Sequence, residues 1–274
     1  MGVIEIDPGM CTNCKICSKI CPVGIILPGS DSEIPFLPAA LEDSCAKCGH
    51  CSSVCPVGAI TPLYENHPPI NNVAYEKRID PGVLANYMQS RRSVRNFLCK
   101  PVEKEKISAI LEIARFAPSG MNAQPVRWLV VNDPLKVRNL SALTIEWMLE
   151  IKEEDGHHPL KNAIPGFLSS WDNGGDPVCR NAPCLVIAYT YSYYNMGFAD
   201  SIISLSHIDI AAPAFGLGTC WAGILQIAMS SYQPLKEELK IPEKFMAQYS
   251  MMLGYPEYEF QKIPGREKAD ILWR

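Results

Sequence analysis

The chain has 274 residues, 47% of them hydrophobic and 20% charged, which is enough apolar material for one large or two ordinary globular domains. The formal net charge of −4 argues against nucleic acid as the main partner. Apolar runs are shorter than the roughly 18 residues that span a membrane, and the N-terminus lacks the basic start of a secretory signal. We therefore expect a cytoplasmic protein without a membrane anchor.

The charge is unevenly distributed along the chain. Residues 1–66 contain seven acidic and three basic side chains, whereas the rest contains 22 of each. Turn-forming residues such as Pro62, Asn66 and Pro69 are dense between positions 62 and 72, which is typical of a linker. The sequence therefore predicts a small acidic domain over residues 1–66, a linker over 67–75 and a second domain over 76–274.

Eight of the twelve cysteines form two copies of one pattern, in which three cysteines at two-residue gaps precede a fourth cysteine and a proline. The copies are Cys11, Cys14, Cys17 and Cys21 with Pro22, and Cys45, Cys48, Cys51 and Cys55 with Pro56. This spacing is typical of [4Fe–4S] binding, and the fourth cysteine ligates the cluster of the other copy. We therefore predict one cluster on Cys11, Cys14, Cys17 and Cys55, and a second on Cys45, Cys48, Cys51 and Cys21.

Two alternatives for these cysteines are weaker. Structural zinc uses paired cysteines with a long gap between the pairs, and disulfides need an oxidising compartment. Residues 1–65 resemble the bacterial two-cluster ferredoxins, which implies low reduction potentials. Eight apolar residues are expected to shield the clusters from water: Ile16, Ile20, Val23, Ile25, Ile26, Val54, Val57 and Ile60.

Several elements can be predicted beyond residue 76. Asp80 before Pro81 predicts a capped helix that runs to Arg91, and apolar spacing predicts another over 103–116. Short apolar runs at 128–131, 185–189 and 247–253 predict buried strands. Residues 197–215 predict a long apolar helix in a core or interface. The segment 152–182, rich in Gly, Pro, Asn and Asp, predicts a long loop or lid with Phe167 and Trp171 as isolated aromatics.

Four separated stretches are weak signals alone, because an arginine pair is usually solvated and Gly-x-Gly is usually a turn. They are residues 91–97 (RRSVRNF), 117–125 (APSGMNAQP), 216–223 (GLGTCWAG), and 254–256 (GYP) followed by Arg266. In this order they resemble the nitroreductase family across residues 76–274. The resemblance implies an α+β fold with a central, mostly antiparallel sheet flanked by helices, placed after the ferredoxin-like two-cluster domain.

The resemblance also implies an FMN site. Arg91 and Arg266 would hold the phosphate, with Ser93 adding a hydroxyl. Arg95 would lie beside the pyrimidine edge and stabilise the charge of the reduced flavin. The full set of expected contacts is Arg91, Arg92, Ser93, Arg95, Pro118, Ser119, Asn122, Gln124, Gly218, Ala222, Gly223 and Arg266. Lys262 lies four residues before Arg266, further than the basic residue in the family pattern, and the bulky Trp221 has no assigned role.

These features together predict an FMN-dependent oxidoreductase. Its two clusters would relay electrons to FMN for the reduction of a small conjugated acceptor such as a nitroaromatic, quinone or activated alkene. The alternative is an electron carrier that shuttles electrons between partner proteins. No Rossmann fingerprint follows a predicted strand, so NAD(P)H would be a transient donor at the flavin, and a redox protein is the other candidate donor. The family resemblance implies a homodimer with FMN at the interface.

The remaining polar and sulfur-containing residues receive no catalytic role. Four cysteines fit no ligand spacing and are expected to be buried free thiols: Cys99, Cys179, Cys184 and Cys220. Four histidines are expected to be structural: His207 in a core, His157 and His158 on a loop surface with substrate contact as the alternative, and His50 capping a turn or facing solvent. Met251 and Met252 are expected to fill a core.

Overall fold

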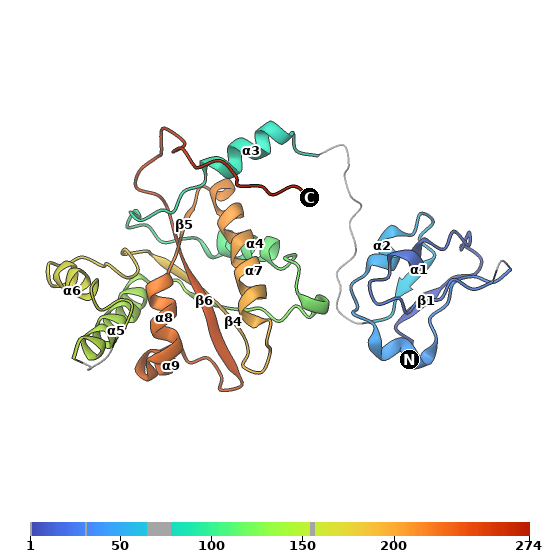
Figure 1. Cartoon of the computed structure of the whole chain (residues 1–274), viewed down its shortest axis with the longest axis horizontal. Helices are drawn as coiled ribbons and strands as arrows, with labels where there is room; N and C mark the ends of the chain where they lie inside the picture. The colour runs from blue at the N-terminus through green and yellow to red at the C-terminus, as the bar shows by residue number, and fades with distance from the viewer. Residues whose placement is uncertain (1, 31, 65–77, 154–156) are drawn as a thin grey trace. The chain divides into compact units, whose positions relative to one another are not determined.

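The computed structural model describes residues 2–30, 32–64, 78–153 and 157–274 (Figure 1). They divide into two compact units, which we call the N-terminal unit (Met1–Arg78 with Ser119–Ala123) and the C-terminal unit (Ile79–Pro118 with Gln124–Arg274). The linker predicted at 67–75 lies outside the described residues, so the domain bounds stay a prediction.

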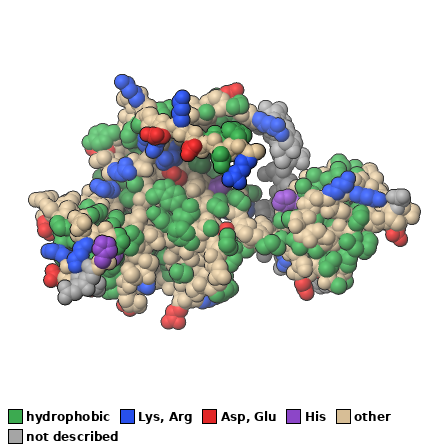
Figure 2. Space-filling view, viewed as in Figure 1, with side chains coloured by type: hydrophobic (Ala, Val, Ile, Leu, Met, Phe, Trp, Pro, Cys, Tyr) green, Lys and Arg blue, Asp and Glu red, His purple; other side chains and the backbone are tan. Residues whose placement is uncertain are grey.

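The N-terminal unit is small and irregular. Its elements are β1 (Ile4–Ile6), α1 (Ile16–Ile20), a 3-10 helix η1 (Ala39–Ser44), α2 (His50–Val54), β2 (Ile60–Pro62) and a second 3-10 helix η3 (Gly120–Asn122). Strands β1 and β2 pair antiparallel, with Ile4 opposite Pro62. The core consists of Cys17, Ile25, Ile26 and Ile60, and hydrophobic side chains also reach the surface (Figure 2).

Both copies of the cysteine motif end in the same turn. The Gly24 N–H donates to the Cys21 carbonyl at 3.1 Å, and the Gly58 N–H donates to the Cys55 carbonyl at 3.3 Å. The two glycines have φ of +70° and +67°, a left-handed conformation that side chains disfavour. The Cys-Pro-Val-Gly repeat in the sequence is therefore a repeat of backbone conformation.

The C-terminal unit has a four-stranded sheet in the order β3-β4-β6-β5, and every neighbouring pair is antiparallel. Its strands are β3 (Arg127–Val131), β4 (Cys184–Tyr191), β5 (Gly218–Trp221) and β6 (Phe245–Gly254). Its helices are α3 (Pro81–Ser90), α4 (Lys104–Ala114), α5 (Pro134–Glu153), α6 (Ile164–Asp172), α7 (Gly197–Ala211), 3-10 helix η4 (Ala212–Phe215), α8 (Gly223–Ser231) and α9 (Gln233–Leu239). The predicted α+β class with a mostly antiparallel sheet is confirmed.

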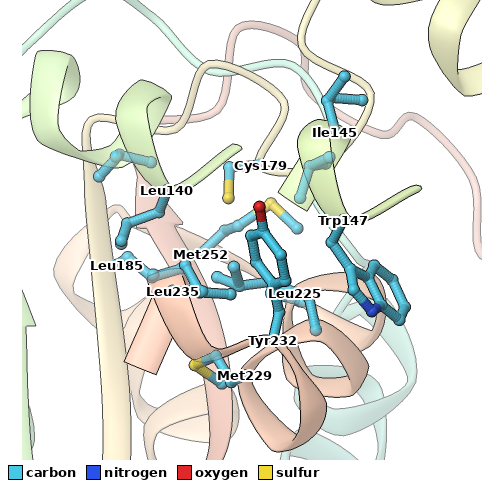
Figure 3. Close-up of a cluster of buried hydrophobic side chains, with 14 of the residues drawn as sticks. Leu140, Ile145, Trp147, Cys179, Leu185, Leu225, Met229, Tyr232, Leu235 and Met252 are labelled. Carbon is cyan, nitrogen blue, oxygen red and sulfur yellow. The ribbon is translucent and has the colours of Figure 1, made fainter. Parts of the chain in front are cut away.

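Helices cover both faces of this sheet. Leu185 and Ile187 of β4 pack into a cluster with α5, α8 and α9, part of which Figure 3 shows. The intervening Val186 and Ala188 pack into a second cluster with α4 and α7. Because successive side chains of a strand point to opposite faces, a strand buried on both faces is apolar throughout, as the run 185–189 is.

Most elements predicted from the sequence are confirmed. The helices at 81–91, 103–116 and 197–215 correspond to α3, α4, and α7 with η4, and the three predicted strands correspond to β3, β4 and β6. Asp80 caps α3, since its Oδ1 accepts from the N–H groups of Gly82 at 2.8 Å and Val83 at 3.1 Å. Met251 and Met252 are buried as expected.

The predicted loop or lid at 152–182 is wrong. The segment contains α6, and Phe167 and Trp171 pack against the core instead of lying isolated. Pro165 lies in the first turn of α6, where a missing N–H costs nothing. Among the described helices, none combines the length and apolar character needed to cross a membrane.

Candidate functional site

The N-terminal unit contains two cavities, and four cysteines line each of them. Cys21, Cys45, Cys48 and Cys51 surround about 420 Å³ of space, part of it open to solvent. Cys11, Cys14, Cys17 and Cys55 line the other cavity, of about 330 Å³, part of which is likewise open to solvent. Each cavity thus takes three cysteines from one copy of the motif and the fourth from the other copy. This is the grouping that the crossed ligand assignment requires.

The surroundings of the cavities are mainly apolar. Ile25 and Ile26 line the first cavity and Ile60 lines the second, all three being buried. Val23, Ile16 and Val57 also line the cavities, although their outer parts are exposed. The expectation was wrong for Ile20 and Val54, which are the last residues of α1 and α2, are exposed, and line neither cavity.

Backbone N–H groups point at the cysteine sulfurs. The Ala59 N–H donates to Cys55 Sγ at 3.2 Å, and the Lys47 N–H donates to Cys45 Sγ at 3.4 Å. Burial is the largest influence on the pKa of Cys21 and raises it, but the N–H groups of residues 23–26 together lower that pKa below its usual value. Such donors stabilise negative sulfur, as cluster ligands need.

The loops between the cysteines have matching left-handed residues. Asn13 and Lys47 each precede the second cysteine of a copy, with φ of +53° and +50°. Lys15 and Gly49 follow it, with φ of +58° and +73°. Left-handed residues in such turns direct successive N–H groups into one concavity, a form found at many iron–sulfur sites. The donor set and the backbone therefore fit an iron–sulfur cluster in each cavity.

Among the described residues, no three His, Cys, Asp or Glu side chains are grouped to hold one ion. Burial raises the pKa of Cys51 to about 11, because a thiolate is disfavoured in apolar surroundings. Bound iron would offset that cost, since a coordinated thiol is deprotonated.

In the C-terminal unit, three of the four stretches meet beside β5, an edge strand of the sheet. Ser93 forms a parallel bridge with Thr219, and the Val94 N–H donates to the Thr219 carbonyl at 2.8 Å. A Cβ at Gly218 would collide with Val94, so glycine permits this close approach. The fourth stretch joins through the Leu98 N–H, which donates to the Tyr255 carbonyl at 2.9 Å.

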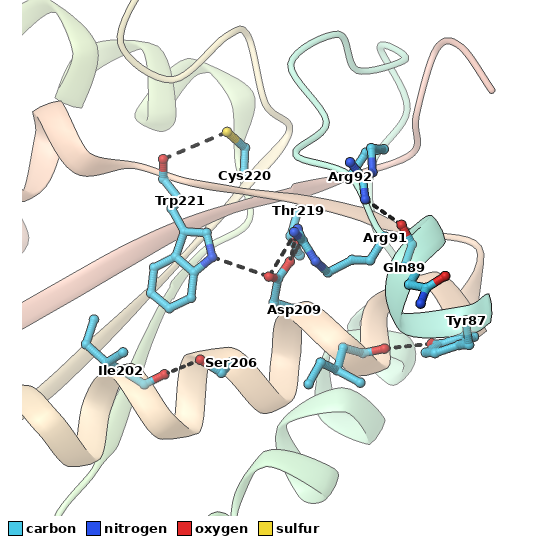
Figure 4. A network of polar contacts seen from close by, with 11 residues as sticks. Tyr87, Gln89, Arg91, Arg92, Ile202, Ser206, Asp209, Thr219, Cys220 and Trp221 are labelled. Atoms are coloured by element: carbon cyan, nitrogen blue, oxygen red, sulfur yellow. Dashed lines mark hydrogen bonds and ion pairs between the residues drawn. The ribbon is translucent and has the colours of Figure 1, made fainter. Parts of the chain in front are cut away.

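Asp209 of α7 lies at the centre of a polar network (Figure 4). Asp209 is buried, and its carboxylate accepts from the Thr219 hydroxyl and from Trp221 Nε1 at 3.3 Å. Arg91 Nη1 forms an ion pair with Asp209 Oδ2 at 3.3 Å. Asp209 was not among the site residues predicted from the sequence. The available signal was an acidic residue, Asp209 or Asp200, within an otherwise apolar helix.

The structure also places the other arginines that were expected to contact FMN. Arg95 is exposed. Burial raises the pKa of the Cys220 thiol, and the positive charges of Arg95, Arg180 and Arg91 partly oppose that rise. Arg180 was also missed by the sequence analysis. Arg92 donates to the Gln89 carbonyl. Arg266 is exposed in the segment after β6, which has no helix or strand.

The second stretch is divided between the units. Ser119 and Asn122 belong to the N-terminal unit, where Asn122 Nδ2 donates to the carbonyls of Ala46 and Lys47. Pro118 and Gln124 belong to the C-terminal unit. Ala222 and Gly223 lie at the start of α8, where the Ala222 N–H donates to the Ser250 carbonyl at 3.0 Å.

The remaining cysteines and histidines follow the expectations in part. Cys179, Cys184 and Cys220 are buried, but Cys99 is exposed, so the expectation of a buried thiol was wrong there. Four of the five histidines lie in the described part of the chain. His50 and His157 are exposed as expected, and His158 is half-buried against Trp147 and so not simply on a loop surface. His207 is half-buried, with Nδ1 2.9 Å from the Ile203 carbonyl oxygen.

Comparisons with known proteins bear on both units. The profile of the nitroreductase family matches residues 88–255, and that of a 4Fe-4S dicluster domain matches residues 10–60. A protein of Archaeoglobus fulgidus, provisionally named NADH dehydrogenase/NAD(P)H nitroreductase, is 28% identical over 188 residues, covering 68% of this chain and 93% of that protein. An FMN reductase [NAD(P)H] of Bacillus subtilis is 25% identical over 181 residues, covering 65% of this chain and 67% of its own.

Solved structures show the same fold. The crystal structure of a nitroreductase with bound FMN from Bacteroides fragilis superposes with a TM-score of 0.57 at 20% identity, covering 69% of this chain and 97% of that one. The likeness concerns the fold, whereas the family match over residues 88–255 covers more than half of the chain. The chain belongs to the nitroreductase family of oxidoreductases, and a 4Fe-4S dicluster domain precedes its family domain.

Proposed function

We propose that this chain is an FMN-dependent oxidoreductase in which two [4Fe–4S] clusters relay electrons to FMN for the reduction of a small conjugated acceptor. Nitroaromatics, quinones and activated alkenes are the proposed acceptor classes. The observation that carries the proposal is the pair of four-cysteine cavities in a chain that also contains a nitroreductase domain. When bound, FMN stores two electrons and each cluster carries one.

The cysteines would hold the clusters in the crossed arrangement, with Cys55 completing the site of the first copy and Cys21 that of the second. Each cavity provides four sulfurs, an apolar wall and backbone donors. The N–H groups at Cys55 and Cys45 would stabilise the charge that reduction adds. The wall would limit the access of water, which also affects the reduction potential.

The residues beside β5 would hold the flavin. Arg91 and Ser93 lie at the start of the segment that pairs with β5, where a guanidinium and a hydroxyl suit a phosphate. Arg95 would stabilise negative charge on the flavin ring. The remaining proposed contacts are Arg92, Pro118, Ser119, Asn122, Gln124, Gly218, Ala222, Gly223 and Arg266. NAD(P)H as a transient donor belongs to the same proposal.

We also propose a homodimer with FMN at the interface. Helix α7 has buried residues such as Leu205 and Ile208, yet it exposes Phe198, Ile203 and Ile210. A helix that is apolar on several sides is typical of an interface. Gel filtration with light scattering should therefore show a flavin-loaded dimer, and a flavin-loaded monomer would contradict this part.

The relay can be tested anaerobically with matched variants. The double variant Cys11→Ser/Cys45→Ser removes a ligand from each cavity, and Cys99→Ser alters an exposed cysteine outside both. Reduction of a nitroaromatic is followed with a one-electron chemical donor and, separately, with NADH. We expect the double variant to keep its FMN content but to lose at least about tenfold in turnover with the one-electron donor, while Cys99→Ser matches the wild type.

Undiminished turnover by the cluster-free variant would remove the relay from the mechanism. The carrier alternative draws support from the acidic N-terminal segment, which suits a basic protein partner. A lid over residues 152–182 would have favoured an enzyme over a carrier, but α6 of this segment packs into the core, so the segment supports neither reading. A carrier would show no saturable turnover of any small acceptor in the same assay.

A further inference from the structure

We propose that Asp209 is a positioning residue that fixes the Arg91 guanidinium in the orientation that receives the FMN phosphate. The inference rests on the proposed function, in which Arg91 binds that phosphate. Asp209 and Arg91 are 118 positions apart in the chain, so the fold creates their contact.

Contacts with residues other than Arg91 already fix the carboxylate of Asp209. The Asp209 side chain is 10% exposed, and two side chains of β5 donate to its carboxylate: the Thr219 hydroxyl to Oδ1 and Trp221 Nε1 to Oδ2 (Figure 4). A buried carboxylate held by two donors from a strand has little freedom to turn. It is therefore a rigid support for a third donor.

Arg91 needs such a support because its own position favours mobility. It follows the last residue of α3, and its side chain is 28% exposed. Only Nη1 engages Asp209, at 3.3 Å from Oδ2 and 3.5 Å from Oδ1. Within the described part of the chain, Nε and Nη2 of Arg91 make no hydrogen bond, so they remain as donors for an anion.

A second contact joins α3 to α7 close to Arg91. The Tyr87 hydroxyl of α3 donates to the carbonyl of Ile210 at 2.6 Å, one residue beyond Asp209 (Figure 4). Helix α3 is thereby tied to α7 at the place where Arg91 begins. The backbone and side chain of Arg91 are therefore both oriented by α7, and the phosphate would meet a guanidinium that has already lost its rotamer freedom.

A carboxylate is required at this position because all converging groups are donors. Asp209 can accept at both oxygens, whereas an asparagine would have to turn its NH2 group toward one of the donors. The variant Asp209→Asn has nearly the same size but leaves one donor unpaired and removes the charge opposite Arg91. We expect Arg91 to lose its fixed orientation in that variant.

The experiment compares two flavins that differ only in the phosphate. Binding of FMN and of riboflavin to the apo-flavin full-length protein is measured by flavin fluorescence. Wild type should bind FMN more tightly than riboflavin, and Arg91→Ala should reduce that preference. Asp209→Asn should weaken FMN binding about tenfold and leave riboflavin binding unchanged, because only the phosphate contact depends on Arg91. In the Arg91→Ala background, Asp209→Asn should have no further effect.

Asp200→Asn is the matched control. Asp200 is a second buried acid of α7, 2% exposed, and it accepts from the Tyr194 hydroxyl at 2.8 Å. Its substitution should leave the ratio of FMN to riboflavin affinity unchanged. If Asp209→Asn does not fold, Thr219→Val removes one donor to Asp209 at nearly constant volume, and it should lower the same ratio by a smaller factor.

The outcomes separate this inference from the proposed function. An equal loss of FMN and riboflavin affinity in Asp209→Asn, or unchanged or tighter FMN binding, would overturn the positioning role while the FMN proposal stands. A wild-type protein that binds neither flavin would overturn both.

Discussion

Cys21 belongs to the first copy of the cysteine motif, yet it lines the cavity of Cys45, Cys48 and Cys51. We predict that Cys21→Ser loses the cluster of that cavity and keeps the other, so that iron per chain falls to roughly half. Anaerobic iron and sulfide analysis tests this, with Cys99→Ser as the control that keeps all its iron. Cys55→Ser should also lose half, and the electron paramagnetic resonance spectra of the two half-loaded variants should differ. Full iron content in Cys21→Ser would contradict the crossed assignment.

A second prediction for single residues follows from the burial of the cysteine thiols in the C-terminal unit. It raises the pKa of Cys179 and of Cys184 to about 12, so at pH 8 their reactive thiolate is scarcely populated. Cys99 is exposed. A thiol reagent should therefore modify Cys99 and spare Cys179 and Cys184 in the folded protein, and modify all three after denaturation. Peptide mapping by mass spectrometry measures this, and rapid labelling of Cys179 in folded protein would contradict it.

The sequence predicts single residues well where the pattern is local. The spacing of the eight motif cysteines predicts that the fourth cysteine of each copy joins the other copy, and the cysteines that line the two cavities agree with this grouping. Asp209 could not be found in this way, because its partner Arg91 lies 118 positions away and is brought to it by the packing of α3 on α7. Cys99 and Cys184 both lie beside apolar residues, and only the fold exposes one and buries the other.

At the scale of elements, two exposed glycines give a pair of predictions with opposite signs. An added Cβ would have open space at both Gly216 and Gly166. Gly216 ends η4 with φ of +71°, so Gly216→Ala should lower the free energy of unfolding by about 1 kcal/mol. Gly166 is helical within α6, so Gly166→Ala should raise it by about 0.5 kcal/mol. Denaturant unfolding measures both, and a change of the same sign in both variants would contradict the backbone argument.

Elements were predictable where their ends carry local signals. Asp80 before Pro81 marked α3, and the same pair at Asp133 and Pro134 starts α5, where Asp133 Oδ1 accepts from the Leu135 N–H at 2.9 Å. The second pair could have revealed α5 but was not used. Helix α6 was missed because Pro165 and Gly166 resemble a loop signal. Strand β5 was missed because it begins at Gly218, in a Gly-x-Gly sequence that resembles a turn.

At the scale of the whole molecule, the two units have very different cores. The buried core of the N-terminal unit is Cys17, Ile25, Ile26 and Ile60, and cysteines of the motif pack against it. The C-terminal unit has two large clusters of buried hydrophobic side chains, one on each face of its sheet. The repeat and the uneven charge predicted two parts from the sequence. The assignment of Ser119–Ala123 to the N-terminal unit was not predictable, because long-range contacts decide it.

A unit with so small a core should depend on its clusters for stability, since metal binding supplies folding free energy to small domains. We predict two unfolding transitions in calorimetry of the anaerobic protein. Removal of iron should abolish the transition of the N-terminal unit and shift the other by less than about 2 °C. Leu225→Ala is the converse perturbation, because Leu225 is fully buried in a cluster of the C-terminal unit. This substitution should lower the free energy of unfolding of the C-terminal unit alone by about 2–5 kcal/mol. If iron removal and Leu225→Ala each moved both transitions, the two cores could not be independent. The iron–sulfur clusters would then stabilise the C-terminal unit as well.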